Sequence, residues 1–528
     1  MQRRLFTGCD RRDLIALGGA IIFFLLLTAL VYPRFATIGT DGVSYALLAK
    51  NVAAGEGFQV FGVIHTYFSP LFSLTIVPLQ WIFNNIDLAA HATVFLLGFG
   101  TLVLLYFTTR RITDPWTAGL ASFFLSVNSS WVAVHLKPLA QPLAGFLSVV
   151  LFALLLHFTR IEKFERKVFF HAALLGILGG LLFLTRPEYI FIVAPLTLFV
   201  FFVLRKETAL KRNMLAILIL VVAFFVTIAP YILFLHSVLG EWTITGRLHE
   251  QYQVTMKELD GTATFTNYPA LPGNPIVLYV KSLLSFTFYE TFIENLLAIE
   301  SNILKSFGLI GTALFGIGLF TLFRERKLHV LGALSVGASM LFALALGHTG
   351  ERGYLTPFLF LFAVPIAVGL RAFSVLLVDQ LALRGVWKKV PIAVMTILCF
   401  ATFSFVLFQN YFFRPPSTQK PLEYQELGVW IKENVPHHET AVVAARKPEI
   451  AYYADTSWFA VTGIETPESL VASMHANNVE YVAIDTRSLG AMVSKFITDD
   501  GIFRAPELEL MKEISYYEEH IYLYRLKR

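Results

Sequence analysis

The chain has 528 residues, of which 56% are hydrophobic and 15% are charged, and its formal net charge is +5. This composition is much more apolar than that of a soluble protein of similar length, so it indicates a protein that uses lipid as its solvent. The positive charge does not indicate a nucleic-acid partner, because most basic residues lie in short clusters between apolar runs, where membrane topology explains them.

The apolar residues gather in runs of about 18 to 22, the length that an α-helix needs to cross roughly 30 Å of hydrocarbon. We therefore expect an α-helical polytopic membrane protein with about eleven transmembrane helices. The expected spans are residues 14–33, 90–109, 115–131, 139–159, 168–185, 188–204, 213–235, 304–323, 329–347, 354–373 and 390–410.

The basic clusters predict the orientation, because Lys and Arg are retained preferentially on the cytoplasmic side of short loops. With these spans every cluster falls on the same side of the membrane. The pattern predicts a cytoplasmic N-terminus, an extracytoplasmic C-terminus and a place in the cell (inner) membrane. The clusters are Arg3/Arg4/Arg11/Arg12, Arg110/Arg111, Arg160/Lys163/Arg166/Lys167, Arg205/Lys206/Lys211/Arg212, Arg324/Arg326/Lys327 and Arg384/Lys388/Lys389.

Residues 34–89 are expected to form an outer juxtamembrane loop. The stretch from Pro70 to Phe83 is apolar, but it is shorter than a normal span, and a crossing here would move all later basic clusters outward. We therefore expect it to lie in the outer interface or to dip into it. Residues 236–303 are predicted to form a second outer loop.

The sequence changes character near Arg414, after which charged residues return and short apolar stretches alternate with helical patterns. We therefore divide the chain into a membrane module, residues 1–413, and a small extracytoplasmic α/β domain, residues 414–528. The domain is expected to contain helices at 422–434 and 467–476 and strands at 440–444, 480–484 and 520–524.

The first outer loop contains Thr40-Asp41-Gly42-Val43-Ser44-Tyr45 and continues as an amphipathic helix that ends near Gly55. The acidic residue has two compatible interpretations. In the commoner one, Asp41 or Thr40 caps the helix by accepting hydrogen bonds from its free N–H groups. In the other, Asp41 is a general base that removes a proton from an acceptor hydroxyl or amine while a sugar is displaced from phosphate.

The stretch from Asp41 to Phe58 resembles the opening loop of the GT-C glycosyltransferases, in which a D-x-x-x-Y helix with a closing Gly-x-Gly-Phe follows the first transmembrane helix. This superfamily includes the protein O-mannosyltransferases and the lipid A aminoarabinose transferases of the family 39 type. Three further stretches match, and the last is the most specific. They are Phe68-Ser69-Pro70-Leu71, Leu184-Thr185-Arg186-Pro187-Glu188 and Glu351-Arg352-Gly353-Tyr354-Leu355-Thr356-Pro357.

The resemblance implies a GT-C-like fold and a glycosyltransferase that moves a sugar from a polyprenyl-phosphate carrier to a lipid, glycan or protein acceptor at the outer face of the membrane. It also implies that Asp41 is the base and that direct displacement inverts the anomeric carbon. Gly42 stands where the family often has Glu, and Gln141-Pro142 stands where it has Glu-Pro. These departures leave the use of a divalent metal and the acceptor class open.

Arg352 and Arg186 suit a phosphate-bearing donor, since a guanidinium group stays charged and presents several N–H donors to phosphate oxygens. Each also has a local alternative. Arg186 can pair with Glu188 and Arg352 with Glu351, or both can reach lipid head groups.

No metal or cofactor site is predicted. His65, His348 and Glu351 lack a paired spacing such as H-x-x-x-H, and isolated histidines at a membrane surface are more often structural. The residues that we expect to support the site are Tyr45, Glu188, Glu351, Tyr354 and His65.

Other classes of function remain open, namely a multi-span transporter or flippase and a non-catalytic assembly or receptor protein. A transporter is expected to carry ionisable residues or broken helices near the bilayer midplane, often in two repeated halves. Here the charged candidates gather at one face beside large outer loops. Whether Asp41 and Arg352 meet in one cavity discriminates between these classes.

Overall fold

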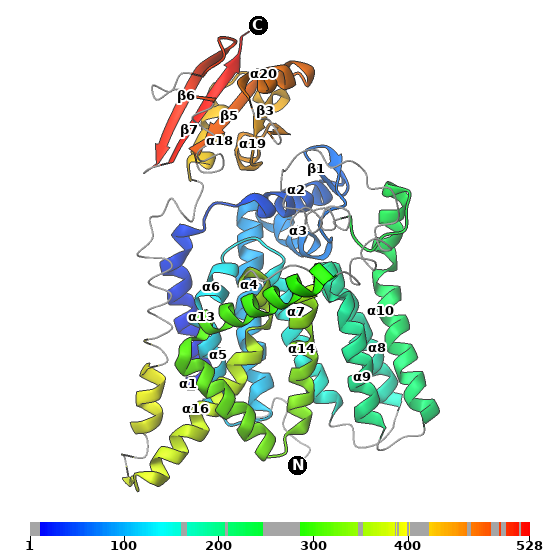
Figure 1. The fold of residues 1–528 in the computed structure, drawn as a ribbon, viewed down its shortest axis with the longest axis vertical. Helices are drawn as coiled ribbons and strands as arrows, with labels where there is room; N and C mark the ends of the chain where they lie inside the picture. Colours follow the sequence, from blue (N-terminus) through cyan, green and yellow to red (C-terminus); the bar gives the residue numbers. More distant parts are fainter. Residues whose placement is uncertain are drawn as a thin grey trace.

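The computed structural model describes residues 11–159, 166–205, 210–246, 286–346, 352–385, 387, 390–398, 401, 422–461, 466–486, 496–497, 503–516 and 519–527. These residues form a bundle of long helices and a small domain that lies beyond one end of the bundle (Figure 1). We call this end the domain side. The opposite end, where α1 (Arg11–Val31) begins, is called the basic side.

Most helices of the bundle run between these two sides (Figure 1). Their outward faces carry large exposed apolar side chains, such as Leu26 and Val226, as expected where lipid replaces water. After α1 the elements of the membrane part are η1 (Tyr32–Arg34), α2 (Thr40–Ala54), β1 (Gln59–Val60), β2 (Val63–Ile64), α3 (Leu71–Phe83), α4 (Ile86–Arg110), α5 (Pro115–Ser126), α6 (Ser129–Val134), α7 (Gln141–Phe158), α8 (Arg166–Thr185), η2 (Pro187–Ile192), α9 (Val193–Leu204), α10 (Leu210–Leu239), α13 (Phe286–Arg324), α14 (Leu328–Leu346), α15 (Arg352–Leu355), η3 (Thr356–Phe358) and α16 (Phe360–Gln380).

Within the described residues, eight helices are long and apolar enough to cross a membrane, which confirms the predicted polytopic helical architecture. The expected span 329–347 is the 19-residue helix α14. Residues 390–410 lie largely outside the described residues. The eight spans are Arg11–Arg34, Ile86–Arg110, Gln141–Phe158, Lys167–Thr185, Pro187–Leu204, Leu210–Leu239, Phe292–Arg324 and Thr356–Gln380.

The expectation of one continuous span over residues 115–131 is wrong, because α5 ends at Ser126 and α6 begins at Ser129. The Asn128 side chain stabilises this break. Its Oδ1 accepts hydrogen bonds from the backbone N–H groups of Ser130 and Trp131, each at 3.1 Å. The hydropathy of the sequence does not reveal this break, because a single polar residue supplies the hydrogen bonds that the free backbone N–H groups need there.

Helix α13 begins at Phe286, inside the predicted outer loop 236–303, so its first part precedes the expected span 304–323. The acidic residues Glu290, Glu294 and Glu300 lower the mean hydropathy of this stretch, which therefore resembles a loop in the sequence. All three lie at exposed positions of the helix. Gly308, with φ of 66°, breaks α13 into two helical parts, and Figure 1 shows the first part running obliquely to the other helices.

The short apolar stretch after Pro70 forms α3, a helix of 13 residues that lies beside α2 at the domain side (Figure 1). Such a length is too short for a span. Its last turn leaves Trp81 68% exposed and Ile82 70% exposed. A helix of this length with an apolar exposed end agrees with the predicted position in the membrane interface.

The C-terminal domain has a five-stranded sheet in the order β4-β3-β5-β7-β6. β3 lies parallel to β4 and β5, whereas β7 lies antiparallel to β5 and β6. The two predicted helices and three predicted strands are confirmed, but α19, β4 and β6 were not predicted. The elements are α18 (Leu422–Asn434), β3 (Val442–Ala445), α19 (Glu449–Ala454), β4 (Ser457–Ala460), α20 (Pro467–Ala476), β5 (Tyr481–Asp485), β6 (Leu508–Tyr516) and β7 (Glu519–Leu526).

The missed elements are either very short or polar. β4 has only four residues, and β6 exposes or half-exposes all but two of its nine residues, so neither gives a clear apolar pattern. The proposed boundary between residues 413 and 414 lies outside the described residues.

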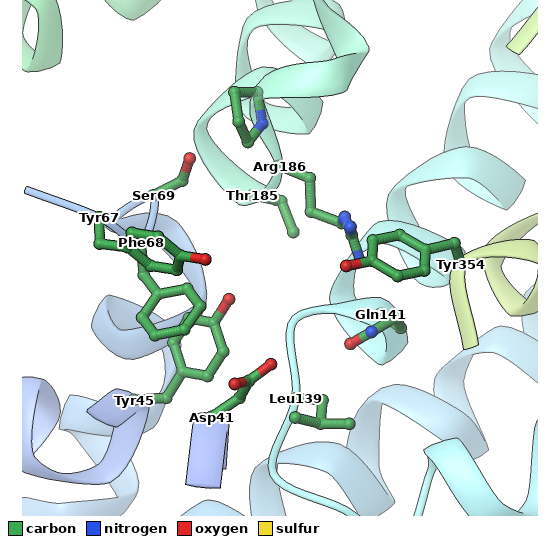
Figure 2. A pocket seen from close by; sticks show the side chains of 11 residues that line it. Asp41, Tyr45, Tyr67, Phe68, Ser69, Leu139, Gln141, Thr185, Arg186 and Tyr354 are labelled. Carbon is green, nitrogen blue, oxygen red and sulfur yellow. The ribbon is translucent and has the colours of Figure 1, made fainter. Parts of the chain in front are cut away.

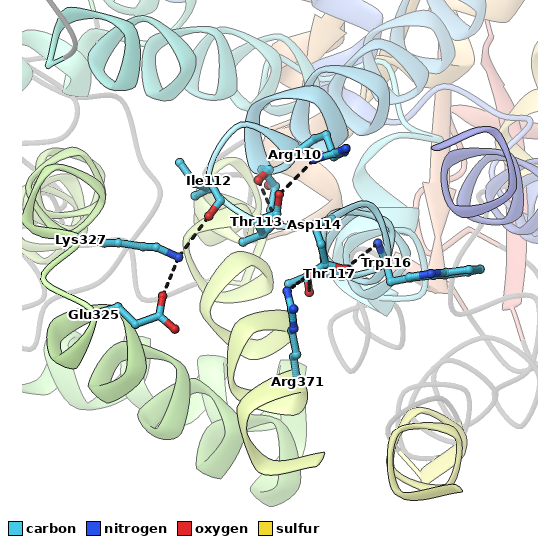
Figure 3. A network of polar contacts seen from close by, with 10 residues as sticks. Arg110, Ile112, Thr113, Asp114, Trp116, Thr117, Glu325, Lys327 and Arg371 are labelled. Carbon is cyan, nitrogen blue, oxygen red and sulfur yellow. Dashed lines mark hydrogen bonds and ion pairs between the residues drawn. The ribbon is translucent and has the colours of Figure 1, made fainter. Parts of the chain in front are cut away.

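The loop between α4 and α5 connects several helices at the basic side (Figure 3). Lys327, at the turn between α13 and α14, donates a hydrogen bond to the carbonyl oxygen of Ile112 at 3.2 Å. Asp114 caps α5 through the backbone N–H of Thr117 and also forms an ion pair with Arg371 of α16. These polar contacts tie α4, α5, α13 and α16 together where the helices leave the apolar layer.

Small residues allow two helix pairs to pack with their backbones in close contact. A Cβ atom added to Gly176 of α8 would lie 2.1 Å from the carbonyl oxygen of Leu220 in α10. A Cβ atom added to Gly369 of α16 would lie 1.9 Å from the carbonyl oxygen of Leu314 in α13. Membrane helices associate largely through such close van der Waals packing.

We expect Gly369→Ala to destabilise the bundle by about 1–3 kcal/mol or more, because the added methyl group forces α16 away from α13. Thermal unfolding of the purified protein in detergent measures this loss. Gly18→Ala is the matched control, since a Cβ at Gly18 of α1 has no neighbour within 4 Å. An equal loss in both variants would contradict the assignment of Gly369 to a close helix contact.

Candidate active site

A cavity lies at the domain side of the bundle, where the loop after α1 meets the ends of several membrane helices (Figure 2). Figure 2 shows Asp41 and Tyr45 on one side and Arg186 with Tyr354 on the other. The lining residues are Asp41, Tyr45, Tyr67, Phe68, Ser69, Leu139, Gln141, Thr185, Arg186, Pro187 and Tyr354.

The first turn of α2 presents Asp41 to this cavity. The N-cap residue of α2 is Gly39, which has an extended backbone, and no side chain caps the helix. The capping interpretation of Thr40 and Asp41 is therefore wrong. Among the described residues the exposed Asp41 carboxylate makes no hydrogen bond or ion pair, so it remains available to a ligand. A negative charge in the first turn is also favourable to the helix.

Gly42 allows α2 to approach the loop before α7. A Cβ atom at Gly42 would lie 2.7 Å from Cγ2 of Ile38 and 3.2 Å from the carbonyl oxygen of Pro138. A glutamate at this position, as the family often has, would require one of these two groups to move. The lack of a side chain at position 42 thus lets α2 pack closely against Pro138, the residue before Leu139 in the cavity wall.

Aromatic side chains form the wall on the Asp41 side. The ring of Tyr45 packs at 4.6 Å from that of Phe68 and at 5.0 Å, edge to face, from that of Phe72. His65 does not line the cavity; its Nε2 accepts a hydrogen bond from the backbone N–H of Phe68 at 3.1 Å. The predicted supporting residue Tyr45 therefore lies at the site, whereas His65 shapes the turn that carries Phe68.

Arg186 forms the opposite wall, at the junction between α8 and η2. The backbone is extended at this residue, with φ of −154°, and Pro187 begins the next helical turn. The Arg186 guanidinium donates to Oε1 of Glu188 at 2.6 Å and lies 4.2 Å from the ring centre of Tyr354. The local pair with Glu188 that the sequence left as an alternative is thus present in the structure.

Arg186 is only 8% exposed, so its charge depends on its neighbours. Burial alone lowers the pKa of the guanidinium, but the negative charge of Glu188 and the hydrogen bond to it outweigh burial and raise the pKa overall. Arg186 consequently stays positively charged.

Arg352 and Glu351 cannot be placed at the site. Glu351 lies outside the described residues, as does the side chain of Arg352, whose backbone begins α15. Tyr354, two residues further on, does line the cavity. The structure therefore brings Asp41 together with Arg186, while the convergence of Asp41 with Arg352 stays a prediction.

Several lining residues were not predicted as site residues. Ser69 and Thr185 belong to motifs noted in the sequence, and Gln141 was noted only as a departure from the family. No sequence signal pointed to Tyr67 or Leu139. The buried Ser69 hydroxyl makes no hydrogen bond among the described residues, which makes it a candidate ligand contact.

The cavity is narrow in this conformation. The cavity together with its open mouth contains about 370 Å³ of space between atoms. The part of this space that the centre of a water molecule can occupy is only about 20 Å³. Such a volume holds about one water molecule. A ligand larger than a water molecule therefore requires lining side chains to move aside before it can bind.

The described residues that line the cavity include one carboxylate, that of Asp41. Across the described part of the chain no three His, Cys, Asp or Glu side chains gather in a way that could hold a metal ion.

Residues 68–234 match a family model described as dolichyl-phosphate-mannose-protein mannosyltransferase. This segment contains Phe68, Ser69, Thr185 and Arg186, which line the cavity. No curated protein sequence matches the chain at a significant level.

Solved structures of membrane glycosyltransferases share the fold. The oligosaccharyltransferase of Archaeoglobus fulgidus in its apo form is 15% identical, with a TM-score of 0.58 over 90% of this chain and 70% of its own. ArnT from Cupriavidus metallidurans bound to undecaprenyl phosphate is 12% identical, with a TM-score of 0.57 over 96% of this chain and 98% of its own. The resemblance seen in the motifs is confirmed, and the chain has the GT-C fold.

We expect Glu188→Ala to destabilise the protein by about 3–5 kcal/mol, because it leaves the buried Arg186 guanidinium without its carboxylate partner. The side chains of the pair are only 10% and 11% exposed. Thermal unfolding in detergent measures the loss. The double variant Arg186→Met, Glu188→Leu is the control and should recover much of it, since it removes both charges. A double variant no more stable than Glu188→Ala would show that the ion pair is not the cause.

Proposed function

We propose that this chain, which has the fold of the GT-C glycosyltransferases, transfers a sugar from a polyprenyl-phosphate carrier to an acceptor at the outer face of the membrane. Asp41 acts as the general base, and Arg186 and Arg352 bind the donor phosphate. The acceptor is a lipid, glycan or protein, and the reaction inverts the anomeric carbon. Tyr45, Tyr354 and Glu188 support these groups.

The observation that carries this proposal is that the Asp41 carboxylate and the Arg186 guanidinium line one cavity from opposite sides (Figure 2). A transferase of this kind requires a proton acceptor beside the attacking group and a cation beside the leaving phosphate. The cavity provides both within a small space.

In the proposed step the acceptor hydroxyl or amine attacks the anomeric carbon of the donor. A bond forms between the acceptor atom and this carbon, the bond from the carbon to the phosphate oxygen breaks, and its electron pair leaves with the polyprenyl phosphate. The proton of the acceptor passes to Asp41. Arg186 stabilises the negative charge that develops on the phosphate, since hydrogen bonds between ionised groups are the strong ones.

The distribution of charge supports an outer-face site. Arg110, Lys327 and Arg371 lie at the basic side, opposite the cavity. Because basic residues are retained in the cytoplasm, the basic side faces the cytoplasm and the cavity opens outside, with the C-terminal domain above it. The protein is accordingly an enzyme of the cell (inner) membrane with a cytoplasmic N-terminus.

Relatives in fold support the classes of donor and acceptor. ArnT from Cupriavidus metallidurans was solved with undecaprenyl phosphate, and AglB from Archaeoglobus fulgidus with a dolichol-phosphate and an inhibitory peptide; AglB is 14% identical, with a TM-score of 0.54 over 89% of this chain and 69% of its own. Both proteins thus bind a polyprenyl phosphate, which supports this class of carrier for this chain.

The placement of buried charges also favours an interfacial enzyme over a transporter. Within the described membrane helices, the buried Asp13 lies near the start of α1, and Arg186 lies between α8 and η2. Both positions are at the ends of helices. A transporter would instead place such groups near the bilayer midplane.

We expect Asp41→Asn to lower the rate of sugar transfer by about 100- to 10,000-fold, the usual contribution of a general base. The assay follows labelled sugar from polyprenyl-phosphate donors to membrane-extracted acceptors. Glu56→Gln is the matched control, because Glu56 is an exposed acid just beyond the other end of α2. Full activity of Asp41→Asn would refute the base assignment, and no transfer by the wild type with any donor would favour a transporter.

We expect Arg352→Ala and Arg186→Lys each to lower kcat/KM for the donor by about 10- to 100-fold, which corresponds to one charge-assisted hydrogen bond. Lysine at position 186 keeps the charge beside Glu188 but loses the planar fork that suits phosphate. Arg324→Ala, at the exposed end of α13, is the control and should leave kcat/KM unchanged. Wild-type kcat/KM in Arg352→Ala would remove that residue from the donor site.

A further inference from the structure

The short helix α19 of the C-terminal domain contacts the segment that carries Asp41. Thr40, the residue before Asp41, donates a hydrogen bond from its hydroxyl to Oε1 of Glu449 at 2.8 Å. The backbone N–H of Ile38 donates to the hydroxyl of Tyr453 at 2.8 Å. Both donors lie within three residues of Asp41, so α19 contacts the backbone that determines where its carboxylate points.

The contact with Glu449 is shielded from water on the side of the carboxyl group, whereas Thr40 is half-buried. Glu449 is only 3% exposed, and burial raises the pKa of its carboxyl group. Either protonation state retains an oxygen that can accept from Thr40. A hydrogen bond in such surroundings is stronger than one exposed to solvent, so it can hold the first turn of α2 in one position.

A third contact anchors α19 to the membrane module beside this segment. The hydroxyl of Tyr452 donates to the carboxylate of Asp87, in the first turn of α4. At the other end of α2, Asp455 forms an ion pair with Lys50 at 3.4 Å, but both side chains are about half exposed. The half-buried contacts thus lie on the side of Asp41, whereas the contact at the far end of α2 is solvent-exposed.

Gly39, between the buried Ile38 and the first turn of α2, adds no side-chain packing to the segment before Asp41. Gly39 is exposed, and a Cβ atom placed on it would meet no atom within 4 Å. It is also the N-cap of α2, and no side-chain hydrogen bond fixes that cap. A glycine without neighbours leaves the backbone free to turn, so the contacts of Ile38 and Thr40 with α19 restrict this motion.

We propose that Glu449 is a positioning residue for Asp41: by accepting the hydrogen bond of Thr40, it fixes the first turn of α2 and aims the Asp41 carboxylate into the cavity. The C-terminal domain thereby completes the active site of the membrane module. This inference rests on the proposed function, in which Asp41 is the base.

A positioning role predicts a loss in the chemical step rather than in donor binding. Misplacing a base by a fraction of an ångström lowers the rate of proton transfer, while the phosphate contacts on the opposite wall are unchanged. We therefore expect Thr40→Val and Glu449→Ala to lower kcat about five- to tenfold with KM for the donor nearly unchanged, since each removes one hydrogen bond.

Conservative variants separate positioning from general damage to the fold. Thr40→Ser and Glu449→Gln keep the donor and the acceptor of the hydrogen bond, so both should retain near wild-type kcat. Asp455→Asn is the matched control, because it removes an acidic contact between the same two parts but at the far end of α2. Asparagine tolerates the positive φ of 55° at this position. A loss in Asp455→Asn equal to that in Glu449→Ala would overturn the inference.

Amide hydrogen exchange of the full-length protein provides a readout that does not depend on activity. Glu449→Ala should raise exchange in residues 36–44, and Glu449→Gln should not. Faster exchange with unchanged kcat would overturn the positioning role, and so would unchanged exchange in Glu449→Ala. Absence of transfer by the wild type would overturn the proposed function itself, while the exchange measurement still decides whether α19 fixes this segment.

Discussion

Hydrocarbon offers no hydrogen-bond partners, so a membrane helix can stop or bend only where other protein groups or water satisfy its free backbone groups. In this chain such breaks gather at the domain side. The extended residue Arg186 and Tyr354 of the short helix α15 both line the cavity. The site exists because several helices end at the same level and leave polar side chains to fill the space between them.

The same constraint explains why the candidate base and the candidate phosphate ligand face each other. Asp41 belongs to a helix outside the apolar layer, and Arg186 belongs to a junction at its edge. Neither side chain crosses hydrocarbon, and the charge of Arg186 is balanced by Glu188. In the proposed reaction the donor has both a lipid tail and a charged phosphate, so the reactive groups are needed at this boundary.

The sequence was sufficient to predict the helical membrane architecture, because span length and apolar runs are set by the thickness of the bilayer. It was also sufficient to select Asp41, Tyr45, Arg186 and Tyr354, since each lies in a motif with a chemical rationale. The break at Asn128 could not be predicted, because one polar residue hardly changes the mean hydropathy of a span. The first part of α13 was missed for the opposite reason, since its exposed acidic residues resemble those of a loop.

Contacts between distant parts of the chain were equally beyond prediction. Glu449 looks like an ordinary surface acid in the sequence, yet it is buried against Thr40, more than four hundred residues away. Gly42 looked like the loss of an acidic ligand, whereas the structure shows that its missing side chain makes room for Pro138. In both cases the role depends on a neighbour that only the fold supplies.

The narrow cavity has a consequence for the fate of an activated sugar. Water is itself a nucleophile, and in the proposed reaction a loosely packed site would hydrolyse the donor and waste the carrier. The wall formed by Tyr45, Tyr67 and Phe68 leaves room for about one water molecule beside Asp41. Protection of the donor from hydrolysis would then come from packing, so that enlarging the cavity would increase futile turnover even where every charged group is kept.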